Sequence, residues 1–398
     1  MRALLGLVIA ATLSMTALPA AACTVSDAAD GAAAGPGAKA DPAARTVAKA
    51  KVPKLRVWRM AGGLDHPWDV VPVGNQRFLV TQRERARLTL IHRGHKRTVK
   101  FPSGRIWVSG ETGLMGLEVD PAFTKNHRIY TCSGWKKSGG GHDVRVIAWK
   151  LDPGLTRARM VRTLVAGFPT STGRHGGCRL LISRNGALHV GTGDAAQGRN
   201  PRSLTSLGGK TLRLNRFTGK PWPSNPWVNA KSAKKRYITS YGHRNVQGIT
   251  QRSNGSIWTI EQGTYRDDEV NRLVIGGDYG YNPVPGYNES VPMTDQSLPG
   301  KQIAARWRSG NPTIATSGGT FLPSKGWGAL NGALAVAVLK DHQVRFLSFS
   351  AKGKLVAQRV RLTHRGRIRT AVVAPNGDLL VTTDRGGGKD VVLRVHPR

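Results

Sequence analysis

A short unit recurs six times after residue 60 of this chain, and this repeat constrains the fold more than any other feature. Each copy has a turn of small residues, a hydrophobic run, and a second run that ends in a basic or polar turn. The first runs are 78–80, 129–131, 187–190, 257–260, 333–336 and 379–381. The turns recur about every 60 residues, which gives room for four strands and their loops. Six such sheets arranged radially form a propeller, which leaves only short sheet edges. The sequence therefore predicts an all-β, six-bladed β-propeller of four-stranded antiparallel sheets over residues 53–398.

Four of the first runs follow an Asn-Gly pair. The pairs are Asn185-Gly186, Asn254-Gly255, Asn331-Gly332 and Asn376-Gly377. Asn-Gly between short alternating runs indicates a β-hairpin with a type I′ turn, because both residues tolerate a positive φ. A further strand is expected before each turn of the six-fold repeat, as at 68–71, 116–119, 179–182 and 371–373.

The first 52 residues differ in composition from the rest. Residues 1–22 begin with Met-Arg, continue through an apolar stretch and end in small residues, as a secretory signal peptide does. Residues 23–52 are rich in Ala and Gly and predict a flexible linker. Cys23 follows three alanines, so lipidation at Cys23 and ordinary cleavage with release both remain open. The chain is expected to be secreted or to reside in the cell envelope, with a membrane contact only through this lipid anchor.

Cys132 and Cys178 remain once Cys23 is set aside. Neither stands in a metal-ligand spacing, so they either form one disulfide between neighbouring blades or are two buried thiols. The net charge is +37, which favours contact with polyanions but does not specify a fold. No helical reader or zinc finger supports sequence-specific nucleic-acid binding. The sequence leaves the oligomeric state open.

Propeller geometry predicts where polar residues meet. The loop that enters the innermost strand of a blade and the loop between its second and third strands open on the same face. Segments expected before innermost strands are 174–175, 244–245 and 367–369; segments expected after second strands are 193–194, 262–264 and 340–341. All six are therefore expected around one mouth of the central channel.

The chemistry of these residues indicates an anion-binding site. Arg244, Lys340, Arg367 and Arg369 form a convergent cationic cluster suited to a planar ligand with several carboxylates. His175 stands among glycines and can accept a proton near neutral pH. The loop 261–264 offers backbone carbonyls to a hard cation.

At these residues the chain resembles the soluble sugar dehydrogenases that depend on pyrroloquinoline quinone (PQQ), the glucose/sorbosone and aldose sugar dehydrogenase family. The most specific stretch is Tyr-Gly-His-Arg-Asn-Val-Gln-Gly at 241–248, which resembles the family's Gly-His-Arg-Asn-Pro-Gln-Gly. Other matching stretches, in the same order as in the family, are 113–123, 209–215, 261–263, 267–269, 277–281 and 366–369.

The resemblance implies a role for each matching residue. His175 matches the catalytic base, and Arg244 and Asn245 match residues that hold PQQ and orient the reacting quinone oxygen. Lys340, Arg367 and Arg369 match basic residues that face the PQQ carboxylates. The carbonyls of Gly263 and Thr264 match those that hold the active-site Ca²⁺, and Glu269 and Tyr279 match a second calcium site. Glu111 stands where the family usually has Gln near sugar and quinone.

The implied function is the PQQ- and Ca²⁺-dependent oxidation of an aldose sugar to its lactone. Hydride passes to the quinone while His175 removes a proton, and an external electron acceptor reoxidises the cofactor. The alternative is a non-catalytic propeller that binds an envelope glycan or a protein, with Glu111 marking loss of the catalytic site.

Overall fold

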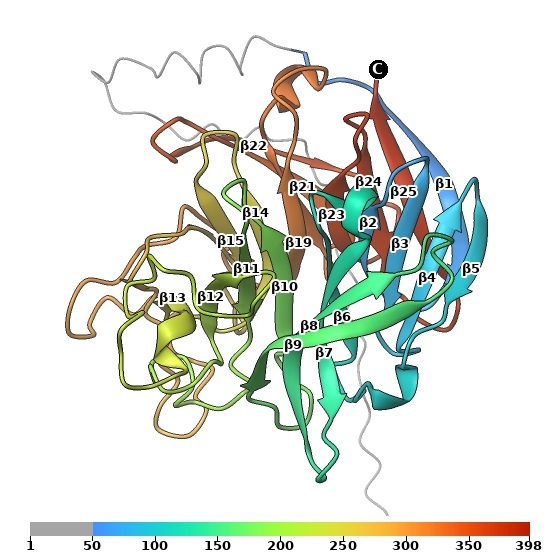
Figure 1. Cartoon of the computed structure of the whole chain (residues 1–398). Coiled ribbons are helices and arrows are strands. Elements are labelled where there is room, and N and C mark those ends of the chain that lie inside the picture. Colours follow the sequence, from blue (N-terminus) through green and yellow to red (C-terminus); the bar gives the residue numbers. More distant parts are fainter. Residues whose placement is uncertain (1–50) are drawn as a thin grey trace, which may run out of the picture. The chain divides into compact units, whose positions relative to one another are not determined.

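The computed structural model describes residues 51–398, and these residues form a six-bladed propeller (Figure 1). Blade 1 contains β2 (Pro67–Pro72), β3 (Arg77–Gln82), β4 (Arg87–His92) and β5 (His95–Val99). Blade 2 contains β6 (Leu114–Val119), β7 (Arg128–Lys136), β8 (His142–Leu151) and β9 (Ala158–Phe168). Blade 3 contains β10 (Gly177–Ile182), β11 (Ala187–Thr192), β12 (Lys210–Asn215), β13 (Ile238–Tyr241) and β17 (Gly277–Asp278).

The other three blades each have four strands. Blade 4 contains β14 (Val246–Gln251), β15 (Ile257–Glu261), β16 (Glu269–Arg272) and β18 (Trp307–Arg308). Blade 5 contains β19 (Thr316–Phe321), β20 (Leu334–Val338), β21 (Gln343–Phe349) and β22 (Leu355–Arg361). Blade 6 contains β23 (Ile368–Val373), β24 (Leu379–Thr383), β25 (Asp390–Pro397) and β1 (Leu55–Leu64).

Helices are short and lie in the connections. They are the α-helix α2 (Phe123–Asn126) and the 3₁₀ turns η1 (Ser103–Arg105), η2 (Lys235–Tyr237) and η3 (Gly328–Leu330). No helix in the described part of the chain has the length and apolar character that a membrane span requires.

The ring is closed by strands from both ends of the described chain. β1 is the outermost strand of blade 6 and pairs antiparallel with β25, from Leu55 opposite Pro397 to Leu64 opposite Asp390 (Figure 1). The innermost strands β2, β6, β10, β14, β19 and β23 contact one another in this order, and β23 contacts β2. The predicted fold is confirmed, with one addition: blade 3 has a fifth strand, β17, which pairs parallel with β13.

Three of the Asn-Gly pairs form short hairpin turns as expected, whereas Asn331-Gly332 lies near the end of the longer connection 322–333, after η3, and the turn type was predicted wrongly. Only the glycine has a positive φ, 85° at Gly186 and 88° at Gly255, whereas neither preceding Asn does. The Gly186 N–H donates to the Ser183 carbonyl, so the glycine is the last residue of its turn. The Asn185 side chain accepts from the Ala187 N–H, and this bond ties the loop without a left-handed Asn.

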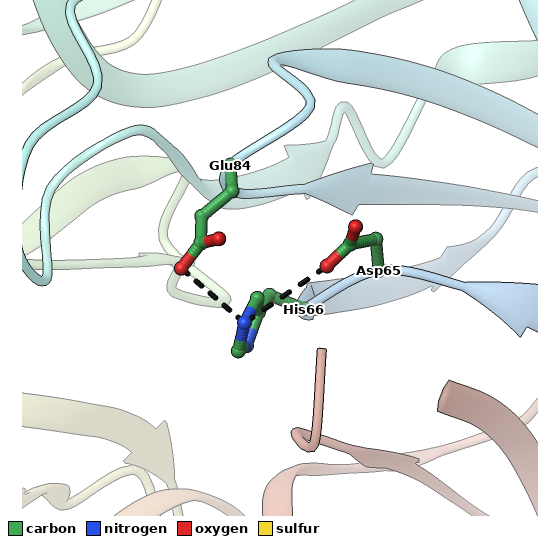
Figure 2. A group of neighbouring side chains, drawn as sticks. All are labelled: Asp65, His66 and Glu84. Atoms are coloured by element: carbon green, nitrogen blue, oxygen red, sulfur yellow. Dashed lines mark ion pairs between the residues drawn. The ribbon is translucent and has the colours of Figure 1, made fainter. Parts of the chain in front are cut away.

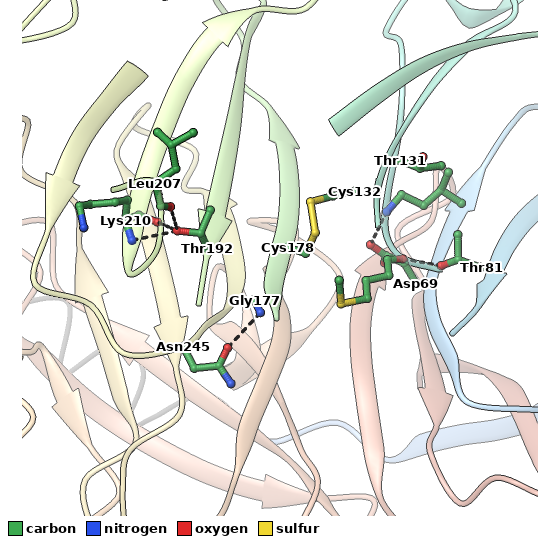
Figure 3. Close-up of a disulfide and its surroundings, with 12 residues drawn as sticks. Asp69, Thr81, Thr131, Cys132, Gly177, Cys178, Thr192, Leu207, Lys210 and Asn245 are labelled. Atoms are coloured by element: carbon green, nitrogen blue, oxygen red, sulfur yellow. Dashed lines mark hydrogen bonds between the residues drawn. A yellow bond between two sulfur atoms is a disulfide. The ribbon is translucent and has the colours of Figure 1, made fainter. Parts of the chain in front are cut away.

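The core lies between the blades. One cluster joins Tyr130 and Val146 of blade 2 to Leu188 and Leu212 of blade 3, all fully buried. At the same blade boundary Cys132 on β7 and Cys178 on β10 form a disulfide, with the Cα atoms 5.5 Å apart (Figure 3). The open question about the two cysteines is thus resolved in favour of a link between neighbouring blades.

The central channel contains a buried ion pair. The Arg179 guanidinium on β10 lies 2.8 Å from Asp69 on β2 and covers the Trp68 ring. Glu118 on β6 lines the same cavity, which has a volume of about 270 Å³. Burial raises the pKa of Glu118 to about 8, and the charge of Asp69 adds to this rise.

We expect Glu118→Gln to stabilise the fold much more at pH 8 than at pH 5. The carboxyl holds a proton in the folded state up to about pH 8, whereas it loses that proton near its ordinary value of 4.5 when unfolded. The unfolded state therefore binds fewer protons between these values, and stability falls as the pH rises through this window. Urea unfolding at several pH values measures the difference, and Asp341→Asn, at an exposed carboxylate that forms no ion pair among the described residues, is the control. Equal midpoints for Glu118→Gln and the unsubstituted chain at pH 8 would contradict the expectation.

Candidate functional site

The six predicted polar segments do meet at one mouth of the channel. The innermost strands β10, β14 and β23 begin at or directly after three of these segments, and the second strands β11, β15 and β20 end just before the other three. A bridge between Gly193 and Asn245 joins two of the segments directly. A Cβ at Gly193 would lie 1.9 Å from the His175 carbonyl oxygen, so only glycine permits this approach.

His175 is held in one orientation at this mouth. Its side chain is nearly fully buried, and its backbone has a left-handed conformation with a φ of 53°. The imidazole Nδ1 lies 2.8 Å from an Asp194 carboxylate oxygen. The His175 backbone N–H donates to the Glu111 carboxylate at 3.1 Å. Since Nδ1 carries the hydrogen bond to the carboxylate, Nε2 is left as the proton acceptor.

Asp194 and Tyr287 complete this arrangement, and neither received a role in the sequence analysis. The Tyr287 hydroxyl donates to the second Asp194 oxygen at 2.8 Å and lies 3.0 Å from His175 Nδ1. Asp194 lies in the segment 193–194 that follows β11, so the rule that predicted the position of the mouth also placed this carboxylate there. Tyr287 lies in the long connection between β17 and β18, where strand order gives no signal.

A hydrogen-bond network links His175 to the cationic side of the mouth. Asn245 donates to Glu111 at 3.4 Å, and its own oxygen accepts from the Gly177 N–H at 3.1 Å (Figure 3). Gln247 donates to Asn245 at 3.3 Å and accepts from Arg369 at 3.2 Å. Predicted residues from several blades are therefore brought together, and the Glu111 carboxylate receives two donors there.

Arg244 is buried in the site and has an acidic partner that the sequence analysis missed. Its guanidinium donates to Glu289 and, at 3.2 Å, to the Gln262 carbonyl. The same Glu289 carboxylate accepts from Arg174 at 2.7 Å and 2.8 Å. Burial opposes ionisation of Glu289, but the hydrogen bonds from Arg174 and Arg244 hold its pKa below the ordinary value. Arg244 Nε has no partner although it is buried.

The remaining predicted cations differ in how their charge is balanced. Arg369 is buried and paired with Asp384, whose pKa lies below its ordinary value because Arg369 and a hydrogen bond from His66 outweigh burial. Lys340 is exposed and Arg367 is partly buried, and neither pairs with a carboxylate among residues 51–398. Lys340 and Arg367 thus carry the free positive charge of the predicted cluster.

Asp65, His66 and Glu84 form a second group of titratable side chains (Figure 2), and His66 Nδ1 lies 2.7 Å from Asp384, the partner of Arg369. His66 Nε2 lies 3.2 Å from Glu84 and 3.9 Å from Asp65, and the three groups are close enough together to share a cation. Each carboxylate already has a guanidinium, Arg83 at 2.6 Å from Glu84 and Arg85 at 3.1 Å from Asp65. We therefore interpret the group as an ion-pair network in the wall of the mouth. Arg83 directly follows β3, so the loop rule locates it as well, although the sequence analysis did not name it.

The loop predicted to hold the first calcium ion has the required donor chemistry. Its shape is fixed by the Gly263 N–H, which donates to Asp268 at 2.9 Å. Within the described residues no hydrogen bond ends on the carbonyl of Gly263 or Thr264. The Thr264 hydroxyl is buried without a partner. Free carbonyls beside an unpartnered hydroxyl fit a hard cation.

The predicted second calcium site consists of Glu269 and Tyr279, both buried. Burial and the charge of the neighbouring Glu261 raise the pKa of Glu269 to about 8. A bound cation would stabilise the ionised carboxylate and so lower this pKa. The Tyr279 hydroxyl is occupied, because it donates to the Arg272 carbonyl at 2.8 Å and accepts from a backbone N–H. Of the two Tyr279 oxygen atoms, the backbone carbonyl is therefore the one available to bind such a cation.

Comparisons with known proteins agree with this fold. The family model described as glucose/sorbosone dehydrogenase matches residues 64–394. Aldose sugar dehydrogenase YliI of Escherichia coli strain K12 is 30% identical over 84% of this chain and 91% of its own length. The crystal structure of the soluble aldose sugar dehydrogenase of Escherichia coli in its apo form superimposes with a TM-score of 0.77 at 28% identity, covering 87% of this chain and all of that one. The PQQ-bound aldose sugar dehydrogenase of Streptomyces coelicolor superimposes with a TM-score of 0.73 at 25% identity, over 87% of this chain and all of that one.

The fold and the site together define a sugar dehydrogenase of the propeller type. The chain belongs to the glucose/sorbosone dehydrogenase family, as its motifs predicted.

Proposed function

We propose that this protein oxidises the anomeric hydroxyl of an aldose to a lactone, with PQQ as the electron acceptor and His175 as the general base. The observation that carries the proposal is the His175–Asp194 pair, held 2.8 Å apart at the mouth where Arg244 and Asn245 also lie. Two relatives support the choice, one named as an aldose sugar dehydrogenase and one solved with PQQ bound.

The residues of the mouth fit PQQ. The buried, unpartnered Nε of Arg244 is a donor that lacks an acceptor, and Lys340 and Arg367 are cations without carboxylate partners in the described chain. These three residues and Asn245 would hold the cofactor. When bound, PQQ supplies a carbonyl group that accepts hydride. The Glu111 carboxylate is compatible with this, because donors from His175 and Asn245 already stabilise its charge.

We also propose two calcium sites, one at the carbonyls of Gly263 and Thr264 and one at Glu269 with the Tyr279 carbonyl. The free carbonyls and the raised pKa of Glu269 support them. A cation near the mouth would add positive charge close to the place where the oxidised sugar gives up its electrons.

The chain's own contribution to the chemistry centres on one proton. His175 Nε2 accepts the proton of the anomeric hydroxyl, and Asp194 stabilises the imidazolium that results. The buried surroundings of His175 and Asp194 exclude water, which strengthens their interaction. Arg244 lies beside Asp194, whose backbone N–H donates to the Arg244 carbonyl at 2.8 Å, and its charge opposes negative charge that develops during oxidation.

The test is reconstitution of the purified protein with PQQ and Ca²⁺, followed by stopped-flow absorbance after the addition of a panel of aldoses. Reduction of the bound quinone by an aldose is the expected result, and the lactone is identified as the product. Quinone binding without reduction by any aldose would contradict the oxidation, and an absence of quinone binding would favour the non-catalytic propeller.

We further propose that the protein works outside the cytoplasm, where an external acceptor takes the electrons. The predicted signal peptide and Cys23 lie outside the described residues and stay predictions, as does the linker up to residue 50. The Cys132–Cys178 disulfide supports an oxidising compartment.

If Cys23 is lipidated, Cys23→Ser will release the protein from membranes into the medium; an unchanged distribution in cell fractions would argue against the anchor.

A further inference from the structure

The connection between β17 and β18 lays Tyr287 and Glu289 over the catalytic mouth. Both side chains are partly exposed, and each bonds to a residue of the proposed site. Glu289 accepts from Arg174 and Arg244, and Tyr287 contacts His175 and Asp194. Glu289 therefore holds the segment at the mouth through Arg174 and Arg244, while the Tyr287 hydroxyl contacts His175.

The hydrogen bonds around Asp194 can be assigned to individual atoms. One carboxylate oxygen accepts from His175 Nδ1 at 2.8 Å and from the Ala196 N–H at 2.8 Å. The other accepts from the Tyr287 hydroxyl at 2.8 Å. The carboxylate is thus fixed at both ends, and its rotation would break one of these bonds.

We propose that Tyr287 is a positioning residue for the general base. Its hydroxyl holds the Asp194 carboxylate in the plane that receives His175 Nδ1–H, and it withdraws part of the carboxylate's charge from the imidazole. This inference rests on the proposed function, since it assigns to His175 the role of base. Tyr287 acts through Asp194 and His175 rather than on the sugar.

Packing alone offers a simpler account of Tyr287, and one substitution separates the two. The ring lies near Tyr281, with centroids 6.5 Å apart, and the Arg174 guanidinium lies 5.7 Å from its centroid. Tyr287→Phe keeps these ring contacts and removes only the hydroxyl. Tyr237→Phe is the matched control, because Tyr237 is also partly exposed and donates its hydroxyl to the Gly219 carbonyl, outside the site.

Tyr287→Phe should lower kcat about tenfold, the lower end of the range for one hydrogen bond to a charged group, with KM nearly unchanged. The acid limb of the kcat/KM profile should move to higher pH by about half a unit, because the unshared Asp194 charge holds the imidazolium more strongly. Tyr237→Phe should match the unsubstituted enzyme in kcat, KM and pH profile. Wild-type kcat and an unmoved acid limb in Tyr287→Phe would overturn the proposal.

A second readout does not depend on sugar oxidation. Proton and nitrogen NMR of the full-length protein without added PQQ reports the His175 Nδ1–H resonance. We expect Tyr287→Phe to shift this resonance and to speed its exchange with water, whereas Tyr237→Phe leaves it unchanged. An identical resonance and exchange rate in Tyr287→Phe would overturn the positioning role even if sugar oxidation is found. If no aldose reduces the quinone in the unsubstituted protein, the proposed function fails, and the NMR comparison still decides whether Tyr287 holds the His175–Asp194 pair.

Discussion

His175→Ala is expected to reduce sugar oxidation about 10³-fold while leaving quinone binding intact. The substitution removes the imidazole that is paired with Asp194 and that is proposed to accept the anomeric proton. A positioned general base contributes about 10²–10⁴-fold to a rate, which sets the size of the effect. Stopped-flow absorbance of the reconstituted variant with its best aldose gives kcat, and a titration with PQQ gives the affinity.

The control for this experiment is His95→Ala, at an exposed histidine at the start of β5, the outermost strand of blade 1. This variant should oxidise sugar at the wild-type rate. A kcat within threefold of wild type in His175→Ala would remove His175 from the role of base. Loss of quinone binding in His175→Ala together with loss of activity would assign His175 to the cofactor cradle instead.

The repeat in the sequence was enough to predict the fold because propeller blades are stabilised locally. Each blade is built mostly from consecutive strands, so hydrophobic runs and turns report on strands that pair with their neighbours in sequence. The exceptions are the elements that pair over long distances. β1 joins β25 from the other end of the chain, and β17 adds to blade 3 after the sequence has passed through blade 4. No local pattern reports on pairings of this kind.

The same distinction explains which site residues were found. His175, Arg244 and Asn245 lie at the start of innermost strands, where topology alone brings distant segments together. Tyr287 and Glu289 come from a connection without regular strands, and their positions depend on how that connection folds back over the mouth. The residue types predicted the cationic cluster, but they did not predict which of its charges are paired with carboxylates. Asp384 pairs with Arg369, and Glu289 is shared by Arg244 and Arg174, so Lys340 and Arg367 are the members of the cluster without a carboxylate partner in the described residues.

The second large effect is expected for Asp194→Asn, and the hydrogen bonds around Asp194 define what this change removes. His175 Nδ1 and the Ala196 N–H both donate to the same oxygen of Asp194. In Asp194→Asn the side-chain carbonyl should therefore occupy the position of this oxygen. The amide nitrogen should then face the Tyr287 oxygen. The imidazole therefore keeps its proton on Nδ1, but it loses the negative charge that stabilises the imidazolium. We expect kcat/KM to fall about 10²-fold.

The pH profile of Asp194→Asn gives the sharper test, because its direction is opposite to that expected for Tyr287→Phe. Without the carboxylate charge the imidazole is a weaker base, so the acid limb should move to lower pH by about one unit or more. In Tyr287→Phe the Asp194 carboxylate no longer receives the Tyr287 hydrogen bond, so more of its charge acts on the imidazole. The acid limb should therefore move to higher pH. Asp152→Asn is the control, since Asp152 accepts hydrogen bonds in a turn of blade 2 and should leave the profile unchanged. Shifts in the same direction for Asp194→Asn and Tyr287→Phe would show that the two residues do not act on His175 through a shared charge.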